Sequence, residues 1–117
     1  MLVLTSKDGE VGILPGHTPL MVALTPGELR IKADGEWRIA AASNGYAEVT
    51  PELMIVVVNA AEWAGDIDVK RAQKALERAE KRFHDQATPS AEKVHARHGV
   101  QRARARLHVA AKYGHPT

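Results

Sequence analysis

Four arginines stand at spacings that could bind phosphate. Arg71 and Arg78 are seven residues apart and Arg102 and Arg106 are four apart, so each pair would lie on one face of a helix. Two antiparallel helices could bring the pairs together, and clustered guanidinium groups clamp phosphate because each can bond two oxygens. A solvated basic face, or one that docks on an acidic protein, has the same pattern. The spacing leaves these interpretations open.

The histidines suggest two further kinds of site. His95 and His98 are three residues apart, which suits metal binding, but no third ligand follows at a neighbouring turn. Solvated helix histidines are the simpler interpretation. His17 lies in the proline-bounded segment Pro15–Pro19, which is either a rigid contact loop or a plain turn.

Sequence signatures of catalysis are missing. The chain contains no G-x-x-x-x-G-K-[ST], no H-E-x-x-H and no G-x-S-x-G. It also has no cysteine, which excludes disulfides, thiol catalysis and cysteine-bound zinc. We therefore predict a non-catalytic protein that requires no cofactor and no metal.

Length and composition limit the kinds of fold that could position these residues. The 117 residues suffice for one modest domain, or for a small domain with an appendage. Aromatic residues make up only 4%, so the core must consist of Val, Ile, Leu and Ala. The longest apolar run, Leu53–Val58, is too short to span a membrane, and no signal-peptide pattern follows Met1. These features predict a cytoplasmic protein.

Charge divides the chain near Gly65. Residues 1–65 carry four Lys/Arg and eight Asp/Glu, a net charge of −4, whereas residues 66–117 carry twelve and six, a net charge of +6. Seven of the nine glycines also lie in the first part. We therefore predict two units, 1–65 and 66–117, with Gly65 as a flexible joint.

The pattern of the first unit predicts a series of short strands. Apolar or alternating runs, separated by turn residues, are Val11–Leu14, Leu20–Leu24, Leu29–Lys32, Trp37–Ala41, Tyr46–Val49 and Leu53–Val58. Asp34-Gly35 predicts a hairpin, and Asn44-Gly45 predicts another turn. Because Leu53–Val58 is apolar on both faces, we expect it in the middle of a pair of sheets. Such closely spaced strands indicate a β-sandwich or a barrel.

The second unit has helical periodicity. We expect a first helix from near Asp66 to between His84 and Ala87. A second helix should begin after the N-cap Thr88, with Pro89 in its first turn, and end at about Lys112, with Gly114 as its C-cap. The expected apolar stripes are Ala72, Ala75, Leu76, Ala79 and Phe83, then Val94, Val100, Ala103, Leu107 and Ala110. Both stripes are rich in alanine, so the hairpin needs a partner surface.

A basic helix pair also raises the question of nucleic-acid binding. Glu77, Glu80 and Asp85 interrupt the positive charge of the first helix, and no aromatic residue stands among the second-helix arginines to stack on bases. A basic helical adaptor, or a nucleic-acid-contacting module, remains the alternative function.

Several motifs together resemble one known family. They are Gly9–Leu20 with its Gly-Ile-Leu-Pro-Gly-His core, Pro26–Ile31, Asn44–Val49, Glu62, Asp66–Ala72 and the tail Arg102–Lys112. In this order and spacing they are similar to the epsilon subunit of the F-type ATP synthase, called delta in mitochondria. The resemblance covers essentially the whole chain.

The resemblance implies a fold and a role. The fold would be α+β, an N-terminal antiparallel β-sandwich followed by a two-helix hairpin. The role would be that of a non-catalytic central-stalk subunit that binds the gamma subunit and the membrane c-ring, couples proton flow to ATP synthesis and restrains hydrolysis at the alpha/beta catalytic head. No nucleic acid is implied, and the location would be the cytoplasmic face of the bacterial plasma membrane or the equivalent organelle membrane.

The resemblance also implies two sets of site residues. An interface with the c-ring would use Pro15, Gly16, His17, Pro19 and Leu20. A regulatory ATP in the folded hairpin would be held by Glu62, Ile67, Asp68, Arg71, Ala72, Arg78, Arg102 and Arg106. For Asp68 and Arg71 the alternative is a local ion pair on the helix surface.

The chain departs from the family pattern in three places. Family members normally have further strands before the segment that matches Gly9, whereas eight residues precede it here. Either the chain is a fragment, or its start was assigned too late, or the sandwich is N-terminally short, which would leave a strand edge unpaired. Ala47 replaces a larger apolar residue. Gly99 and its neighbouring histidines make the second helix less regular.

Overall fold

The computed structural model describes residues 1–6, 9–13 and 20–113. Within these ranges the first half of the chain forms strands and the second half forms helices, as predicted. The strands are β1 (Leu2–Ser6), β2 (Gly9–Ile13), β3 (Leu20–Leu24), β4 (Gly27–Ala33), β5 (Glu36–Ala42), β6 (Gly45–Val49), β7 (Met54–Val58) and β8 (Ala61–Trp63). A short 3₁₀ helix, η1 (Ala64–Asp66), leads into α1 (Val69–His84) and α2 (Ser90–Tyr113).

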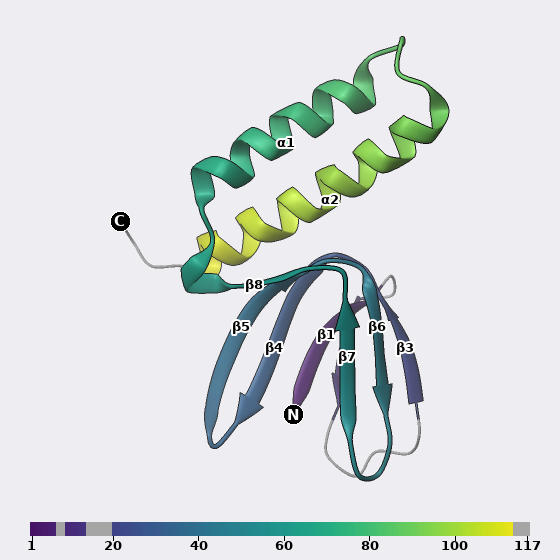
Figure 1. The fold of residues 1–117 in the computed structure, drawn as a ribbon. Helices are drawn as coiled ribbons and strands as arrows, with labels where there is room; N and C mark the ends of the chain where they lie inside the picture. The colour runs from purple at the N-terminus through teal and green to yellow at the C-terminus, as the bar shows by residue number, and fades with distance from the viewer. Residues whose placement is uncertain (7–8, 14–19, 114–117) are drawn as a thin grey trace.

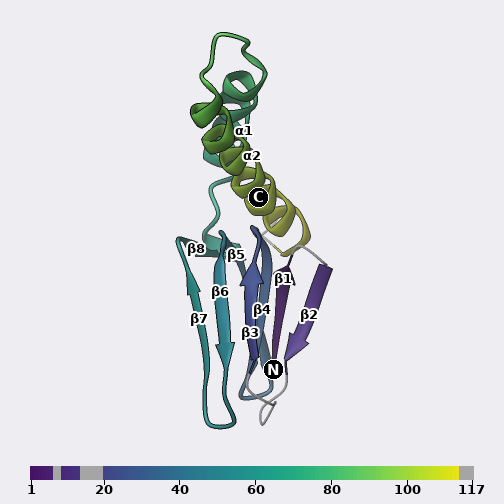
Figure 2. The same ribbon diagram turned by 90° about the vertical axis from the view of Figure 1, so that its right-hand side faces the viewer.

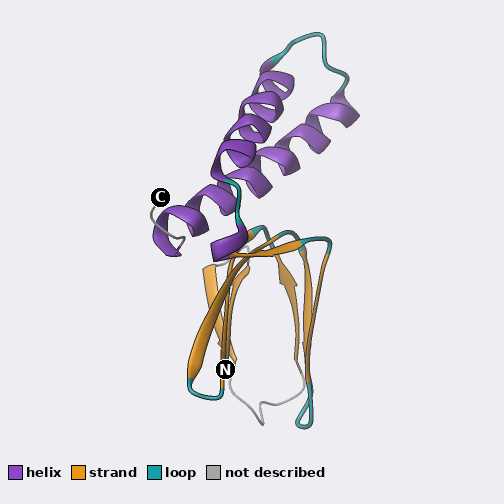
Figure 3. Ribbon diagram, turned by 60° about the vertical axis from the view of Figure 1, so that its left-hand side comes forward, coloured by secondary structure: helices purple, strands orange, loops and turns teal. Residues whose placement is uncertain are grey.

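The strands form two antiparallel sheets. The larger has the order β2-β1-β4-β5-β8 and the smaller the order β3-β6-β7. Figure 3 shows the two sheets as separate layers, with both helices beyond one end of them. Side chains from both sheets form one apolar core, so the predicted sandwich is confirmed.

The core contains only aliphatic residues among those described, as the low aromatic content predicted. It consists of Leu2, Leu4, Ile13, Leu24, Leu29, Ala40, Ala47 and Val49. Ala47 is fully buried, and its strand neighbours Val22 and Val56 pack against the same cluster. The small side chain of Ala47 is therefore part of a packed layer.

The predicted hairpin at Asp34-Gly35 joins β4 to β5. Asp34 has φ 52° and Gly35 has φ 80°, the left-handed pair that a tight two-residue turn requires. The strands pair in full register from Gly27–Ala42 to Ala33–Glu36. Leu29 and Ile31 share the core face, while Glu28 and Arg30 occupy the opposite face.

The structure adds β1 to the expected strands and corrects the position of β7. β1 was not foreseen, although Leu2 and Leu4 supply two of the core side chains. At Asn44-Gly45 the chain bends, as predicted, and passes there from the larger sheet to the smaller one. β7 is an edge strand rather than a central one: Ile55 and Val57 are 41% and 42% exposed, while alternate residues face the core.

The helices begin slightly later than expected. α1 starts at Val69, not near Asp66, because Asp68 caps it by accepting the backbone N–H of Arg71 at 3.0 Å. α2 starts at Ser90, one residue after Pro89, whose carbonyl accepts the backbone N–H of Lys93. α1 ends at His84, as predicted. Gly114, the expected C-cap, lies outside the described residues.

The expected stripe of α2 was wrong at Val94, which is 51% exposed, and it missed three buried residues, Ala96, Ala105 and Val109. The helix buries two faces, because it packs against α1 on one side and against β4, β5 and η1 on the other. Ala96, Val100 and Ala103 share one face, while Ala105 and Val109 lie opposite. A single stripe cannot describe such a helix.

The hairpin docks on the outer face of the larger sheet at one end. Figures 1 and 2 show α1 and α2 running antiparallel, with the C-terminal half of α2 nearest the strands. Val109 packs on Ala41 and Ala64, with Ile39, Ile67 and Tyr113 around them. Gly65, the expected joint, lies in η1 beside this contact. Among the described residues no helix is both long and apolar enough to cross a bilayer.

Candidate functional site

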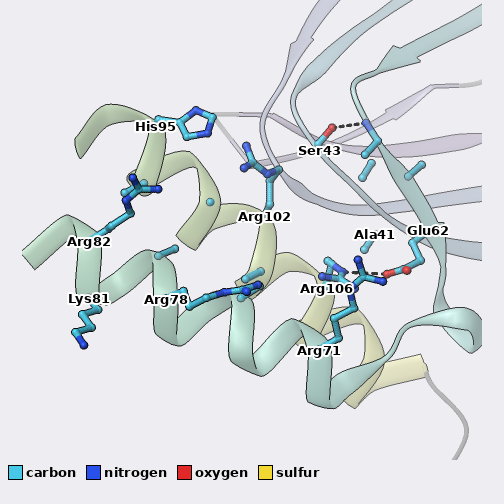
Figure 4. Close-up of a pocket in the computed structure, with 18 of the residues that line it drawn as sticks. Ala41, Ser43, Glu62, Arg71, Arg78, Lys81, Arg82, His95, Arg102 and Arg106 are labelled. Atoms are coloured by element: carbon cyan, nitrogen blue, oxygen red, sulfur yellow. Dashed lines mark hydrogen bonds and ion pairs between the residues drawn. The ribbon is translucent and has the colours of Figure 1, made fainter. Parts of the chain in front are cut away.

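A cavity of about 960 Å³ lies between the hairpin and the adjoining end of the sandwich. Its walls come from β5, the β7–β8 connection, β8, α1 and α2, as Figure 4 shows. The polar and charged lining residues are Ser43, Glu62, Arg71, Arg78, Lys81, Arg82, Asp85, His95, Arg102 and Arg106. Its volume lies in the range of ordinary small-molecule sites.

Small side chains create this space. The sheet contributes four alanines and the helices contribute four more alanines and Gly99. A Cβ placed on Gly99 would lie 3.3 Å from the Cβ of Ala79, so glycine here lets the two helices approach closely. The alanine-rich stripes therefore shape both the helix–helix contact and the cavity. They also give the cavity apolar walls against which a flat ring could pack.

The four arginines singled out by their spacing all line this cavity. Arg71 and Arg78 extend from α1, and Arg102 and Arg106 extend from α2 (Figure 4). Among the described residues Arg71, Arg78 and Arg102 form no ion pair, so their guanidinium groups are available to an anion. Six Lys and Arg side chains line the cavity against two carboxylates, Glu62 and Asp85. This arrangement suits a polyanion such as a phosphate chain.

Arg106 is held by Glu62 of β8. Its Nε donates to Glu62 Oε1 at 2.9 Å, and both side chains are only partly exposed. The pair joins the cavity wall of α2 to the edge of the larger sheet. A bound anion would compete with Glu62 for Arg106, since one guanidinium can serve both only by reorienting.

Three members of the expected ATP set do not line the cavity. Ile67 packs beside Val109 in the helix–sheet contact, and Ala72 is fully buried. Asp68 caps α1 through the backbone N–H of Arg71, so the local side-chain ion pair considered for these two residues is not what the structure shows. These residues place the first turn of α1, and thereby Arg71.

Sequence reasoning missed other cavity residues. Lys81 and Arg82 follow Arg71 by ten and eleven residues, and His95 precedes Arg102 by seven, so helical spacing alone could have added them. Ser43 could not be found in this way. It is buried, and its Oγ accepts the backbone N–H of Ala60 at 2.7 Å, which ties β5 to the β7–β8 connection (Figure 4).

The other sequence-based sites have different outcomes. Pro15, Gly16, His17 and Pro19 lie outside the described residues, while Leu20 opens β3 and is 37% exposed. His95 and His98 are both exposed, and His95 lies at the lining of the cavity. Within the described ranges no three His, Cys, Asp or Glu side chains are grouped as metal ligands.

Comparison with known proteins identifies the family. Residues 1–64 match the family model of the beta-sandwich domain of the ATP synthase delta/epsilon chain, and residues 66–111 match that of its long alpha-helix domain. The chain belongs to the ATP synthase delta/epsilon family. The predicted resemblance is thereby confirmed.

Relatives of this delta/epsilon chain extend over nearly its full length. It is 41% identical over 113 residues to an ATP synthase epsilon chain, chloroplastic, from Zygnema circumcarinatum, covering 96% of this chain and 84% of the relative. It is 44% identical over 110 residues to the ATP synthase epsilon chain of Caldicellulosiruptor bescii, covering 94% and 80%.

A solved structure shares the fold. A chain of the Euglena gracilis mitochondrial ATP synthase, OSCP/F1/c-ring in rotational state 1, matches with a TM-score of 0.77 at 24% identity, covering 94% of this chain and 68% of that one. At this identity the match supports the arrangement of sandwich and hairpin.

Proposed function

We propose that this chain is a non-catalytic subunit of the rotating central stalk of a proton-translocating F-type ATP synthase. There it binds the gamma subunit and the c-ring and couples rotation to ATP synthesis, on the cytoplasmic or equivalent face of the energy-converting membrane. Family membership over both parts of the chain carries this proposal. The Euglena assembly that contains the structurally similar chain includes F1 and a c-ring, which agrees with it.

An exposed apolar face supports binding to gamma. On the outer side of the smaller sheet, Met21 is 65% exposed and Tyr46 is 42% exposed, and Ile55 and Val57 complete the patch. The strand register places Ala23, Tyr46 and Val57 in one row and Met21, Glu48 and Ile55 in the next. Apart from Glu48, which lies between Met21 and Ile55, this exposed face is apolar, and exposed apolar surface usually marks a protein–protein contact.

Tyr46→Lys tests this face. We expect the variant to keep the thermal unfolding midpoint of the parent within a few degrees, because Tyr46 is not in the core. We also expect it to lose most co-purification with gamma, because a charge would have to be desolvated in the interface. Trp37→Lys is the matched control: its aromatic side chain is 45% exposed on the other sheet. Equal recovery of gamma with both variants would contradict the proposed face.

We further propose that the hairpin restrains ATP hydrolysis and that ATP stabilises its folded position. The cavity supports this, because its unpaired arginines come from both helices while its apolar walls include the sheet. A polyanion bound there would contact α1 and α2 at once. ATP would therefore favour the packed hairpin over an extended one. The size of the shift is set by how much more tightly ATP binds the packed form than the extended form.

The adaptor alternative gives a different result in the same preparation. A tagged chain co-expressed with gamma and the catalytic head should recover both, and its retention on nucleic acid should be negligible. Recovery without either subunit, together with salt-sensitive retention on DNA or RNA, would favour the adaptor.

A further inference from the structure

A carboxylate is buried where α2 meets the sandwich. Glu28 is only 7% exposed and lies on the face of β4 turned away from the sandwich core. Burying a charged carboxylate is unfavourable unless charged or hydrogen-bonding partners compensate for the lost water. The partners of Glu28 therefore show what this position is built to hold.

Most of these partners come from the last turns of α2. Tyr113 donates its hydroxyl to Glu28 Oε2 at 3.0 Å. Lys112 Nζ lies 3.7 Å, and His108 Nε2 3.9 Å, from Oε1. Tyr113 is four positions after Val109 and shares its sheet-facing side, while His108 and Lys112 are more than half exposed and reach Glu28 from the edge of the contact.

On the sandwich side, a guanidinium group places a positive charge beside the carboxylate. Arg30 Nε lies 2.9 Å from Glu28 Oε2, and the Nη2 group of the same arginine bonds Glu10 Oε2 of β2 at 3.0 Å. Glu10, Arg30 and Glu28 thus form a chain of alternating charge across β2 and β4. The pKa of Lys112 is raised, first by its hydrogen bond with Tyr113 and then by the charge of Glu28.

The apolar part of the same contact is small. Val109 is the one large side chain that is fully buried there among the described residues, against Ala41 and Ala64. A contact with little apolar area depends more heavily on its polar bonds. If the C-terminal end of α2 separates from the sheet, Glu28 and its partners all become solvated. No charge is then left buried and unpaired. Such a contact can open and close reversibly.

We propose that Glu28 is a polar latch that fixes the C-terminal turns of α2 to the sandwich. The latch is a property of this chain alone, whereas its use in regulation rests on the proposed stalk function. It acts on the end of α2 that leaves the sandwich when the hairpin extends. It therefore sets how readily the packed hairpin opens, from a position outside the arginine-lined cavity.

Amide hydrogen exchange of the isolated full-length chain tests the latch. Glu28→Gln keeps the shape and an acceptor oxygen but removes the charge, and Tyr113→Phe removes only the donor on α2. We expect exchange in residues 105–113 to become roughly tenfold faster in each variant, as expected from loss of a hydrogen bond to a charged group. Exchange in β1 and β4 should stay unchanged. Glu48→Gln, at an exposed carboxylate of the smaller sheet, is the control.

The double variant distinguishes one shared contact from two separate ones. If Glu28 and Tyr113 act through the same bond, the combined variant should exchange no faster than the more affected single variant. Unchanged exchange of residues 105–113 in Tyr113→Phe would overturn the latch, even if Glu28→Gln unfolds the sandwich. Because this measurement uses no partner subunit, its failure would leave the stalk proposal to the co-purification experiment.

Discussion

At the scale of single residues, Gly45 shows how closely β6 and β7 approach each other within the smaller sheet. A Cβ on Gly45 would overlap the carbonyl oxygen of Val57 in the neighbouring strand, so no side chain fits there. Gly35 differs, because its Cβ position is open but its φ of +80° disfavours other residues. The two glycines are required for different reasons.

Alanine substitution at Gly45 and at Gly35 distinguishes the steric requirement from the backbone requirement. We expect Gly45→Ala to lower the free energy of unfolding by about 2–4 kcal/mol, because strands β6 and β7 must separate locally. Gly35→Ala should cost about 1 kcal/mol of backbone strain. Urea unfolding monitored by far-UV circular dichroism measures both. A cost for Gly45→Ala no larger than that for Gly35→Ala would show that β7 shifts without strain.

The arginine cluster makes a prediction at the same scale. Replacing Arg102 and Arg106 together by alanine should abolish ATP binding measured by calorimetry, since two of the five guanidinium groups that line the cavity disappear. Arg104→Ala is the matched control: it lies on the same helix, is 67% exposed and pairs with Glu80 on α1, away from the cavity lining. ATP binding retained by the double variant would reject the clamp.

At the scale of elements, α2 is the part that joins the hairpin to the sandwich. One of its faces packs on α1 and the opposite face packs on β4, β5 and η1. The ion pairs between the helices, Arg104–Glu80 and Arg82–Glu92, are largely exposed and contribute little. The position of the hairpin therefore depends on the sheet-facing side of α2.

Two valines of this helix allow a matched test. Val109 is fully buried against the sheet, and Val94 is 51% exposed. Val109→Ala should destabilise the docked helix by about 1.5–2 kcal/mol, because it removes two buried methyl groups. Val94→Ala should change stability by less than about 0.5 kcal/mol. Thermal unfolding checks both values, and equal effects would place the docking contact elsewhere.

At the scale of the whole molecule, the sandwich core and the helix contact are separate clusters. Among the residues that the structure describes, the core side chains come from β1 to β7 and none comes from the hairpin. The second cluster joins η1, β5 and α2 through few side chains. A weakly docked appendage on a self-contained sandwich is the arrangement that a two-state regulatory element requires.

Truncation after Gly65 tests the regulatory role. We expect the reconstituted ATP synthase with the shortened subunit to hydrolyse ATP faster than the complex with the full chain, because the basic hairpin can no longer engage the catalytic head. Recovery of the shortened chain with gamma is the control for assembly. An unchanged hydrolysis rate in a fully assembled complex would argue against restraint by the hairpin.

Much of this organisation follows from the sequence because it depends on local chemistry. Asp34-Gly35 predicts its hairpin since few other pairs tolerate two positive φ angles. The change from period two to period 3.6 separates strands from helices, and the spacing of the four arginines predicts shared helix faces. Family motifs add the identity of the subunit.

Tertiary structure decided what depends on contacts between distant residues. The edge position of β7 follows from the order of strands in its sheet, and the two buried faces of α2 follow from its two packing partners. The periodicity of the sequence shows neither the strand order nor the packing partners. The small side chains of β5 and α2 became a cavity only when the hairpin folded over the sheet. In the sequence, Glu28 is an ordinary polar residue of a strand. In the structure it is buried beneath Tyr113, 85 positions away, and this burial makes it a latch. The reason is that the free energy of a carboxylate depends on the groups that surround it.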